Sequence, residues 1–181
     1  MSSSKNANFY FGISDNKIYI CFIDNKKNKL SDSVSFDIPD SLSNNLNFKI
    51  ILSLLRKNIR KLEKDIGLFV NSGNISIKSK SYQSILFSVK DIFDERELEK
   101  EVIIKLVRVA MQQLQKCEKN LTIIHVIINK YVIDDKVYNF FPNYKKFTKI
   151  ILEIEFICLN KILIEKVKKL FNECKIDVKK I

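Results

Sequence analysis

The sequence predicts a mixed α/β (α+β) fold, because two periodicities of apolar residues alternate along the chain. Residues 48–65 carry apolar side chains at the three- and four-residue spacing of an amphipathic helix. Residues 150–159 instead alternate, with Glu153 and Glu155 between apolar residues, as a half-buried strand does. With 181 residues, 46% of them hydrophobic, the chain can form a core, and its composition excludes disorder.

The first third of the chain predicts three strands followed by one helix. Strands are expected at residues 9–14, 17–23 and 33–38, which are rich in β-branched and aromatic side chains. Asp15 and Asn16 separate the first two strands and are typical of a hairpin turn. The helix at 48–65 has Asn47 as its predicted N-cap and ends before Gly67.

The remainder predicts a second group of strands around a long helix, and then a closing strand, helix and strand. Strands are expected at 68–71, 74–78, 84–89, 122–128, 131–133, 137–141, 150–159 and 177–181. Asp94 and Glu97 match a D-x-x-E capping box, which predicts that a helix begins there and continues to about Cys117. A last helix is expected at 161–174, with Asn160 as its N-cap.

The net charge of +11 favours, at first sight, a nucleic-acid partner. However, 28 of the 32 basic residues are Lys and only four are Arg, and Asn occurs 17 times. Lys, Asn and Ile have A/T-rich codons, so an A/T-rich genome explains this composition without a polyanionic partner. Base recognition and bidentate phosphate binding favour Arg. We therefore expect no nucleic-acid partner, with a basic nucleic-acid-binding domain as an alternative.

Residues suited to catalysis or metal binding are scarce. The four Cys are far apart in the sequence and His125 is the one His, so a metal site is not expected. His125 lies in an apolar run that predicts a buried strand, with a Cys–His nucleophilic dyad as the alternative. The GxxxxGK[ST], GxSxG and HExxH motifs do not occur. We expect no enzyme activity and no catalytic residue.

The sequence also bears on localisation. The apolar runs at 123–128 and 150–159 are much shorter than the roughly 20 residues of a membrane span. The N-terminus lacks the apolar segment of a signal peptide. Together with four unclustered Cys, these features predict a cytoplasmic protein.

The order of the motifs resembles the N-terminal part of FtsA, the actin-like bacterial cell-division family, in a truncated and degenerate form. The resemblance is carried by Gly12-Ile-Ser-Asp-Asn-Lys-Ile18, Val70-Asn-Ser-Gly-Asn-Ile75, the stretch 123–134 with its His, Tyr and Asp, and Phe141-Pro-Asn-Tyr with the strand and helix that follow to Val178. It implies a partial actin-like (ribonuclease-H-like) lobe, subdomain 1A, at 1–66 and 146–181. It also implies an inserted SHS2 (1C-like) interaction subdomain at 67–145.

The resemblance places the family's first phosphate loop at Gly12, Ser14, Asp15, Asn16 and Lys17. The Asp and Gly that serve metal and nucleotide in the family are replaced here by Gly12 and Ser14. A carboxylate for Mg²⁺ is thereby lost, and a position of close backbone approach to phosphate has gained a side chain. We therefore expect a degenerate loop, no cofactor and no ATP hydrolysis.

The family's SHS2 subdomain implies a function in protein–protein interaction. The expected partners are division proteins, among them the tubulin-like division ring protein and later divisome proteins, with self-association or a companion chain carrying a second lobe as further options. The expected location is the cytoplasmic face of the inner membrane at the division site, with at most peripheral membrane association. The pilus-assembly protein PilM has a similar layout and is an alternative.

Strand edges are ready-made association surfaces, so we expect the partner surface at residues 70–78, 84–89 and 131–141. Seven residues in these ranges are the named candidates, and Tyr138, Phe140 and Phe141 are the expected anchors because exposed aromatic residues often dominate interface energy. The seven candidates are Val70, Asn74, Ile75, Tyr131, Tyr138, Phe140 and Phe141. For each of them, the alternative is that one alternating set of these side chains fills the core.

Overall fold

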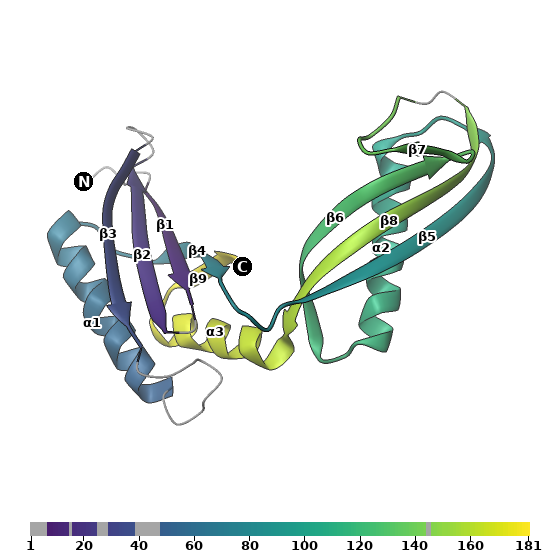
Figure 1. Cartoon of the computed structure of the whole chain (residues 1–181). Coiled ribbons are helices and arrows are strands. Elements are labelled where there is room, and N and C mark those ends of the chain that lie inside the picture. Colours follow the sequence, from purple (N-terminus) through teal and green to yellow (C-terminus); the bar gives the residue numbers. More distant parts are fainter. Residues whose placement is uncertain (1–6, 15, 25–28, 39–47, 144–145) are drawn as a thin grey trace. The chain divides into compact units, whose positions relative to one another are not determined.

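The structure is a computed structural model, and it describes residues 7–14, 16–24, 29–38, 48–143 and 146–181. The chain forms two compact units (Figure 1). The first unit comprises Met1–Lys80 and Ile162–Ile181, and the second unit comprises Ser81–Lys161. Each unit has its own sheet and its own core, so the mixed α/β class predicted from the sequence is confirmed.

The first unit is built on a five-stranded sheet. Its strands are β1 (Ala7–Ile13), β2 (Lys17–Asp24), β3 (Lys29–Asp37), β4 (Ser72–Ile77) and β9 (Asp177–Lys180), in the order β3-β2-β1-β4-β9. The first three strands are antiparallel, whereas β4 runs parallel to β1 and β9 runs parallel to β4.

Two helices, α1 (Phe48–Ile66) and α3 (Lys161–Glu173), cover one face of this sheet (Figure 1). Buried side chains of both helices pack against Phe9, Phe11 and Ile13 of β1. The rings of Phe11 and Phe171 are packed edge to face, with 4.7 Å between their centroids. The helix α1 ends at Gly67, whose φ of +69° is a left-handed conformation that favours Gly.

The second unit contains a four-stranded antiparallel sheet and one helix. Its strands are β5 (Gln83–Arg96), β6 (Leu121–Ile133), β7 (Lys136–Tyr138) and β8 (Phe147–Asn160), in the order β5-β8-β6-β7. The helix α2 (Lys100–Cys117) lies against one face, and its buried residues pack on alternating residues of the central strand β8.

The unit boundaries differ from the predicted ones, which were 67–145 for the inserted subdomain and 1–66 with 146–181 for the lobe. The strand β4 hydrogen-bonds with β1 and therefore belongs to the first unit. The strand β8 pairs with β5 and β6 and therefore belongs to the second unit. The boundaries lie after Lys80 and after Lys161 because the pairing of distant strands decides membership.

Three local predictions are corrected as well. The capping box at Asp94 and Glu97 is wrong, because β5 continues to Arg96, whose backbone pairs with Phe147, and α2 begins at Lys100. The segment 68–71 is not a strand, and β4 is the only strand between α1 and β5 in the described chain. The strands expected at 122–128 and 131–133 form one strand, β6, with bulges near Ile123 and Ile128.

Candidate interaction surfaces

The predicted phosphate loop is a tight hairpin turn between β1 and β2. The backbone N–H of Ser14 donates to the carbonyl oxygen of Lys17 at 2.9 Å. The Ser14 hydroxyl donates to the same carbonyl at 3.0 Å and accepts the backbone N–H of Lys17 at 3.1 Å. The hydroxyl is thereby used in closing the turn, and Asp15 lies outside the described residues.

The other residues of this loop are engaged within the first unit. The Lys17 ammonium lies 3.4 Å from the Asp37 carboxylate and 6.0 Å from the centre of the Tyr19 ring. A side chain added at Gly12 would meet Tyr19 at 3.5 Å, an ordinary contact, so no close approach requires Gly there. Asn16 is exposed, and its Oδ1 lies 3.5 Å from the Ser14 hydroxyl. These contacts describe a structural turn.

Two of the three candidates in the first unit are buried, so their assignment to a partner surface is wrong. Val70 and Ile75 are each only 5% exposed and belong to the core beneath α1 and α3. Ile75 is the register partner of Phe11 and points to the same, helix-covered face. Asn74 directly precedes Ile75 on β4, so its side chain points to the opposite face of the sheet, where it is half-buried.

The four aromatic candidates lie in the second unit around β7. Tyr131 and Tyr138 are register partners on β6 and β7, and both pack in part against the core on the α2 side. Burial raises the pKa of Tyr131. The Phe141 ring contacts Tyr131 edge to face at 6.0 Å between centroids, and Phe140 is 72% exposed. Phe140 and Phe141 follow β7 and are not in a strand, which corrects the strand expected at 137–141.

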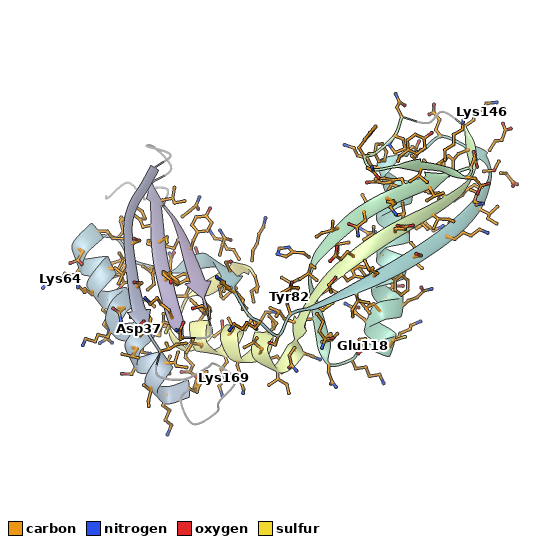
Figure 2. All side chains as sticks on the ribbon, in the orientation of Figure 1. Asp37, Lys64, Tyr82, Glu118, Lys146 and Lys169 are labelled. Carbon is orange, nitrogen blue, oxygen red and sulfur yellow. The ribbon has the colours of Figure 1, made fainter. Side chains whose placement is uncertain are left out.

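The sheet of the second unit has a face that no described element covers, opposite α2 (Figures 1 and 2). We call it the open sheet face and define it by its apolar residues, Leu86 and Ile92 of β5, Ile127 and Val132 of β6, Val137 of β7, and Ile151 and Ile157 of β8. Leu86 is 74% exposed, and Ile92, Ile127 and Val137 are also exposed. Exposed apolar side chains grouped on one sheet face are typical of a binding surface.

Polar residues cross the middle of the open sheet face. The register aligns Ser88, Glu153 and Lys130 across β5, β8 and β6, and the Lys130 ammonium lies 3.0 Å from the Glu153 carboxylate. In the adjacent row, Glu155 lies between Leu86 and Ile127 and accepts hydrogen bonds from Ser84 and Asn129. The open sheet face therefore combines two apolar areas with a hydrogen-bonded polar centre.

The tight turn between β6 and β7 holds one edge of the open sheet face in place. Asp134 and Asp135 both have positive φ, 44° and 67°, as a two-residue hairpin turn of this type requires. The Asp134 carboxylate accepts the N–H groups of Thr148 and Lys149 at 3.1 and 2.9 Å and the Thr148 hydroxyl at 3.0 Å. Partial desolvation alone would raise the pKa of Asp134, but these hydrogen bonds and the Lys149 charge lower it.

His125 is exposed on β6, which contradicts the buried strand position predicted from its apolar neighbours. It is the register partner of Ile157 and so points to the open sheet face. Cys158, the next residue on β8, is buried on the α2 side, and burial raises the pKa of its thiol. These two side chains therefore lie on opposite faces of the sheet and form no dyad.

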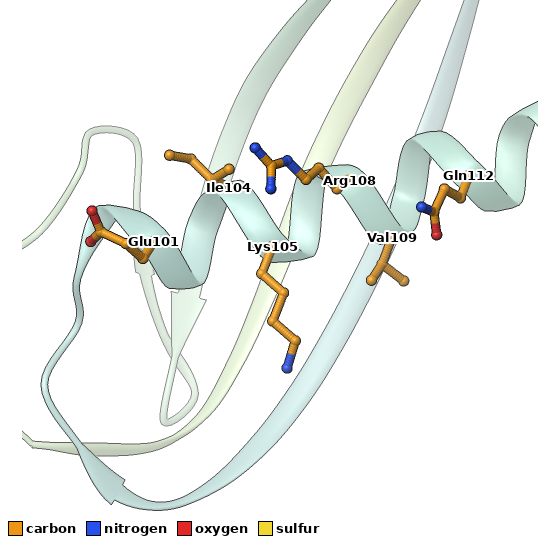
Figure 3. Close-up of a pocket in the computed structure, with 6 residues that line it drawn as sticks. All are labelled: Glu101, Ile104, Lys105, Arg108, Val109 and Gln112. Atoms are coloured by element: carbon orange, nitrogen blue, oxygen red, sulfur yellow. The ribbon is translucent and has the colours of Figure 1, made fainter.

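A shallow pocket of about 410 Å³ lies on the outer side of α2. Figure 3 shows that its lining residues, Glu101, Ile104, Lys105, Arg108, Val109 and Gln112, all come from this one helix. Among the described residues, no group of three or more His, Cys, Asp or Glu side chains is placed to hold a metal ion. Within the same residues, no helix is long and apolar enough to cross a membrane.

Comparison with protein-family models found no match, and comparison with curated protein sequences found none. Among solved structures, the chain is similar to the cytoplasmic domain of EpsL, an inner membrane component of the type II secretion system of Vibrio cholerae. The identity is 10% and the TM-score is 0.41, with 96% of this chain and 56% of that chain covered. The chain thus spans little more than half of the length of that domain.

Leu86 and Val137 lie within the ranges 84–89 and 131–141 predicted for the partner surface but were not named individually, whereas Ile92 and Ile127 lie outside those ranges. A signal for Leu86 was present in the sequence. Ile85, Leu86 and Phe87 are three consecutive apolar residues in a strand. Because successive side chains of a strand point to opposite faces, at least one of the three must leave the core face. The structure places Ile85 and Phe87 against the core and Leu86 on the open sheet face.

Proposed function

We propose that the chain is a protein-interaction module that turns over no nucleotide and binds a partner protein through the open sheet face of its second unit. The observation that carries this proposal is the exposed apolar set on that face, with Leu86 as its most exposed member. The fully buried part of an interface is more apolar than the rest of the surface, and complementary polar groups fix the register of the two partners. The Lys130–Glu153 pair and Glu155 would have this orienting role.

The absence of nucleotide turnover is the second part of the proposal. A phosphate loop needs free donors that point at the nucleotide. Here the Ser14 hydroxyl and the backbone N–H groups of Ser14 and Lys17 are engaged within the hairpin. The Lys17 ammonium lies near Asp37. These contacts support a structural turn in place of a catalytic loop.

For the biological assembly, we propose an FtsA-like role in a bacterial division complex at the cytoplasmic face of the inner membrane. The ordered motif set at 12–18, 70–75 and 123–134 supports this assignment. The strand order of the first unit is consistent with it. A PilM-like role in pilus assembly is the alternative and would use the same surface with a different partner.

The experiment is a binding titration of the purified full chain with the tubulin-like division ring protein. We expect micromolar binding, weakened at least about 10-fold by the double substitution Leu86→Lys and Val137→Lys, because a buried charge opposes burial of both apolar areas. The control is Ile104→Lys. Ile104 is also an exposed aliphatic residue of the second unit, but it lies on α2 and not on the open sheet face.

Binding that is equally weakened by Ile104→Lys would contradict a role for the open sheet face. Failure of the ring protein to bind, together with binding of a pilus-assembly protein that the double substitution weakens, would favour the PilM-like alternative. Calorimetric detection of micromolar Mg-ATP binding to the unaltered chain would contradict the second part of the proposal.

A further inference from the structure

The positive charge of the chain is concentrated in the first unit. That unit contains 19 Lys and Arg against 10 Asp and Glu, a net charge of +9. The second unit, which has 81 residues, contains 13 against 11, a net charge of +2. A codon bias acts along the whole chain, so it does not by itself explain a charge gathered in one unit.

Within the first unit, the helix α1 carries a basic stripe along its exposed side. Lys49, Lys57, Arg60, Lys61 and Lys64 are all exposed and follow the helical period opposite the buried Ile51, Leu55, Ile59 and Leu62. Figure 2 shows Lys64 projecting away from the sheet. From Lys49 to Lys64 the stripe is about 22 Å long.

The stripe is not neutralised by neighbouring carboxylates. Among the described residues, none of the five cations of the stripe forms an ion pair, whereas Arg56 at its margin pairs with Glu173 of α3. Glu63, a half-buried residue of the same helix, is engaged elsewhere: its carboxylate accepts the backbone N–H of Val70 at 2.8 Å. The exposed Asp65, next to Lys64 and one helical turn after Lys61, offsets one of the five charges, so the stripe presents a net positive surface.

Exposed apolar side chains lie at the two ends of this stripe. Ile50 is exposed in the first turn of α1. Phe69, three residues after the last residue of α1, is 86% exposed. The hydrogen bond between Val70 and Glu63 holds the Phe69 segment beside the last turns of the helix. Such exposure is unusual for Phe in water.

We propose that the α1 stripe, with Ile50 and Phe69, is a docking surface for an anionic phospholipid membrane. Lysines near an anionic bilayer each contribute to adsorption, and apolar side chains enter the boundary between headgroups and acyl chains. A nucleic acid fits the site less well, because four of the five cations are Lys and Ile50 would gain nothing from a phosphate backbone. The inference concerns the first unit and is independent of the proposed partner surface.

The test is sedimentation of the full chain with vesicles of phosphatidylcholine alone and with about 30% phosphatidylglycerol added. We expect binding only to the anionic vesicles, with affinity falling as salt rises. The triple substitution Lys57→Gln, Lys61→Gln and Lys64→Gln should lower the partition coefficient about 100-fold. The matched control is Lys100→Gln, Lys116→Gln and Lys119→Gln in the second unit, which removes the same charge from exposed positions and should change it less than about 3-fold.

A second pair of substitutions tests the apolar contribution. Phe69→Ser should weaken vesicle binding about 5-fold at every salt concentration, because the lost contact is not electrostatic. Tyr82→Ser, an exposed aromatic in the second unit, is its control and should have no effect. Circular dichroism verifies that each variant is folded.

Three results would overturn the proposal. Equal losses in the two lysine triples would show that binding follows total charge and not the α1 stripe. An absence of binding to anionic vesicles would remove the lipid ligand. Tighter binding to duplex DNA than to anionic vesicles, lost in the α1 triple, would assign the stripe to nucleic acid.

Discussion

In the first unit two helices cover one face of the sheet, and in the second unit one helix does so. The other face has no described covering element in either unit, but the two uncovered faces differ in chemistry. In the first unit that face carries small or polar residues and tyrosines, among them Gly12, Ser35 and Tyr19. In the second unit it carries Leu86, Ile92 and other aliphatic residues.

The difference separates two kinds of surface. A face of tyrosines, serines and glycine is stable in water because its polar groups stay hydrated. A face of exposed leucine, isoleucine and valine gains free energy when a partner removes it from water. The second unit is therefore the better candidate for protein binding, and the helices of the first unit carry the charge that suits an anionic surface.

The largest expected effect tests whether the two cores are energetically separate. Phe171→Ala should destabilise the first unit by about 3–5 kcal/mol, and Phe156→Ala should destabilise the second unit by a similar amount, because both rings are fully buried. Amide hydrogen exchange resolved by residue would measure the two free energies. If either substitution accelerates exchange equally in both units, the stabilities of the two units are coupled and the prediction is wrong.

A smaller effect distinguishes two glycines of the first sheet. In Gly73→Ala the added Cβ would lie 2.5 Å from the Phe11 ring and 3.0 Å from the Phe9 carbonyl oxygen, so the core must shift at a cost of about 1–3 kcal/mol. Gly12→Ala, with Tyr19 at 3.5 Å on the uncovered face, should cost less than about 0.5 kcal/mol. Urea denaturation monitored by circular dichroism measures both.

The smallest expected effect depends on pH and belongs to the β6–β7 turn of the second unit. Because the folded pKa of Asp134 is lowered, its carboxylate stabilises the folded state fully above the unfolded value of about 3.9. This stabilisation is lost as pH falls through the folded pKa. Asp134→Asn should therefore reduce stability at pH 7, and the difference from the unaltered chain should vanish in strong acid.

The matched control for this turn is Asp135→Asn. Asp135 also has positive φ, which Asn tolerates, and its exposed carboxylate lies 2.6 Å from the half-buried Lys149 ammonium. Its effect at pH 7 should be smaller than that of Asp134→Asn, because a surface ion pair is worth little. A pH-independent difference for Asp134→Asn would contradict the role assigned to its charge.

Local patterns predicted the mixed α/β class and the positions of the helices within a few residues. They failed where pairing between distant residues overrides a local signal. Asp94 and Glu97 match the capping-box sequence pattern, yet β5 continues to Arg96 because β8 supplies a hydrogen-bonding partner as far as Phe147. The unit boundaries differ from the predicted ones for the same reason, since no short sequence window contains both strands of the β1–β4 pair or of the β5–β8 pair.

The candidate surface was harder to predict, because alternation defines two faces of a strand without telling which is buried. Val70 and Ile75 were expected at a surface and lie in the core. Phe140 was expected at a surface and is exposed. The choice depends on where the helices pack, and that is set by the tertiary structure.

The register of β5 and β8 has a consequence for how the second unit can be handled. The chain enters this unit along β5 and leaves it along β8, and Gln83 and Cys158 near the two boundaries are register partners. The ends of the fragment 81–161 therefore lie side by side, as the two arms of a hairpin do. Because its two ends are adjacent, we expect that the fragment 81–161 can be inserted in place of the turn of a surface hairpin in an unrelated protein without displacing that protein's strands.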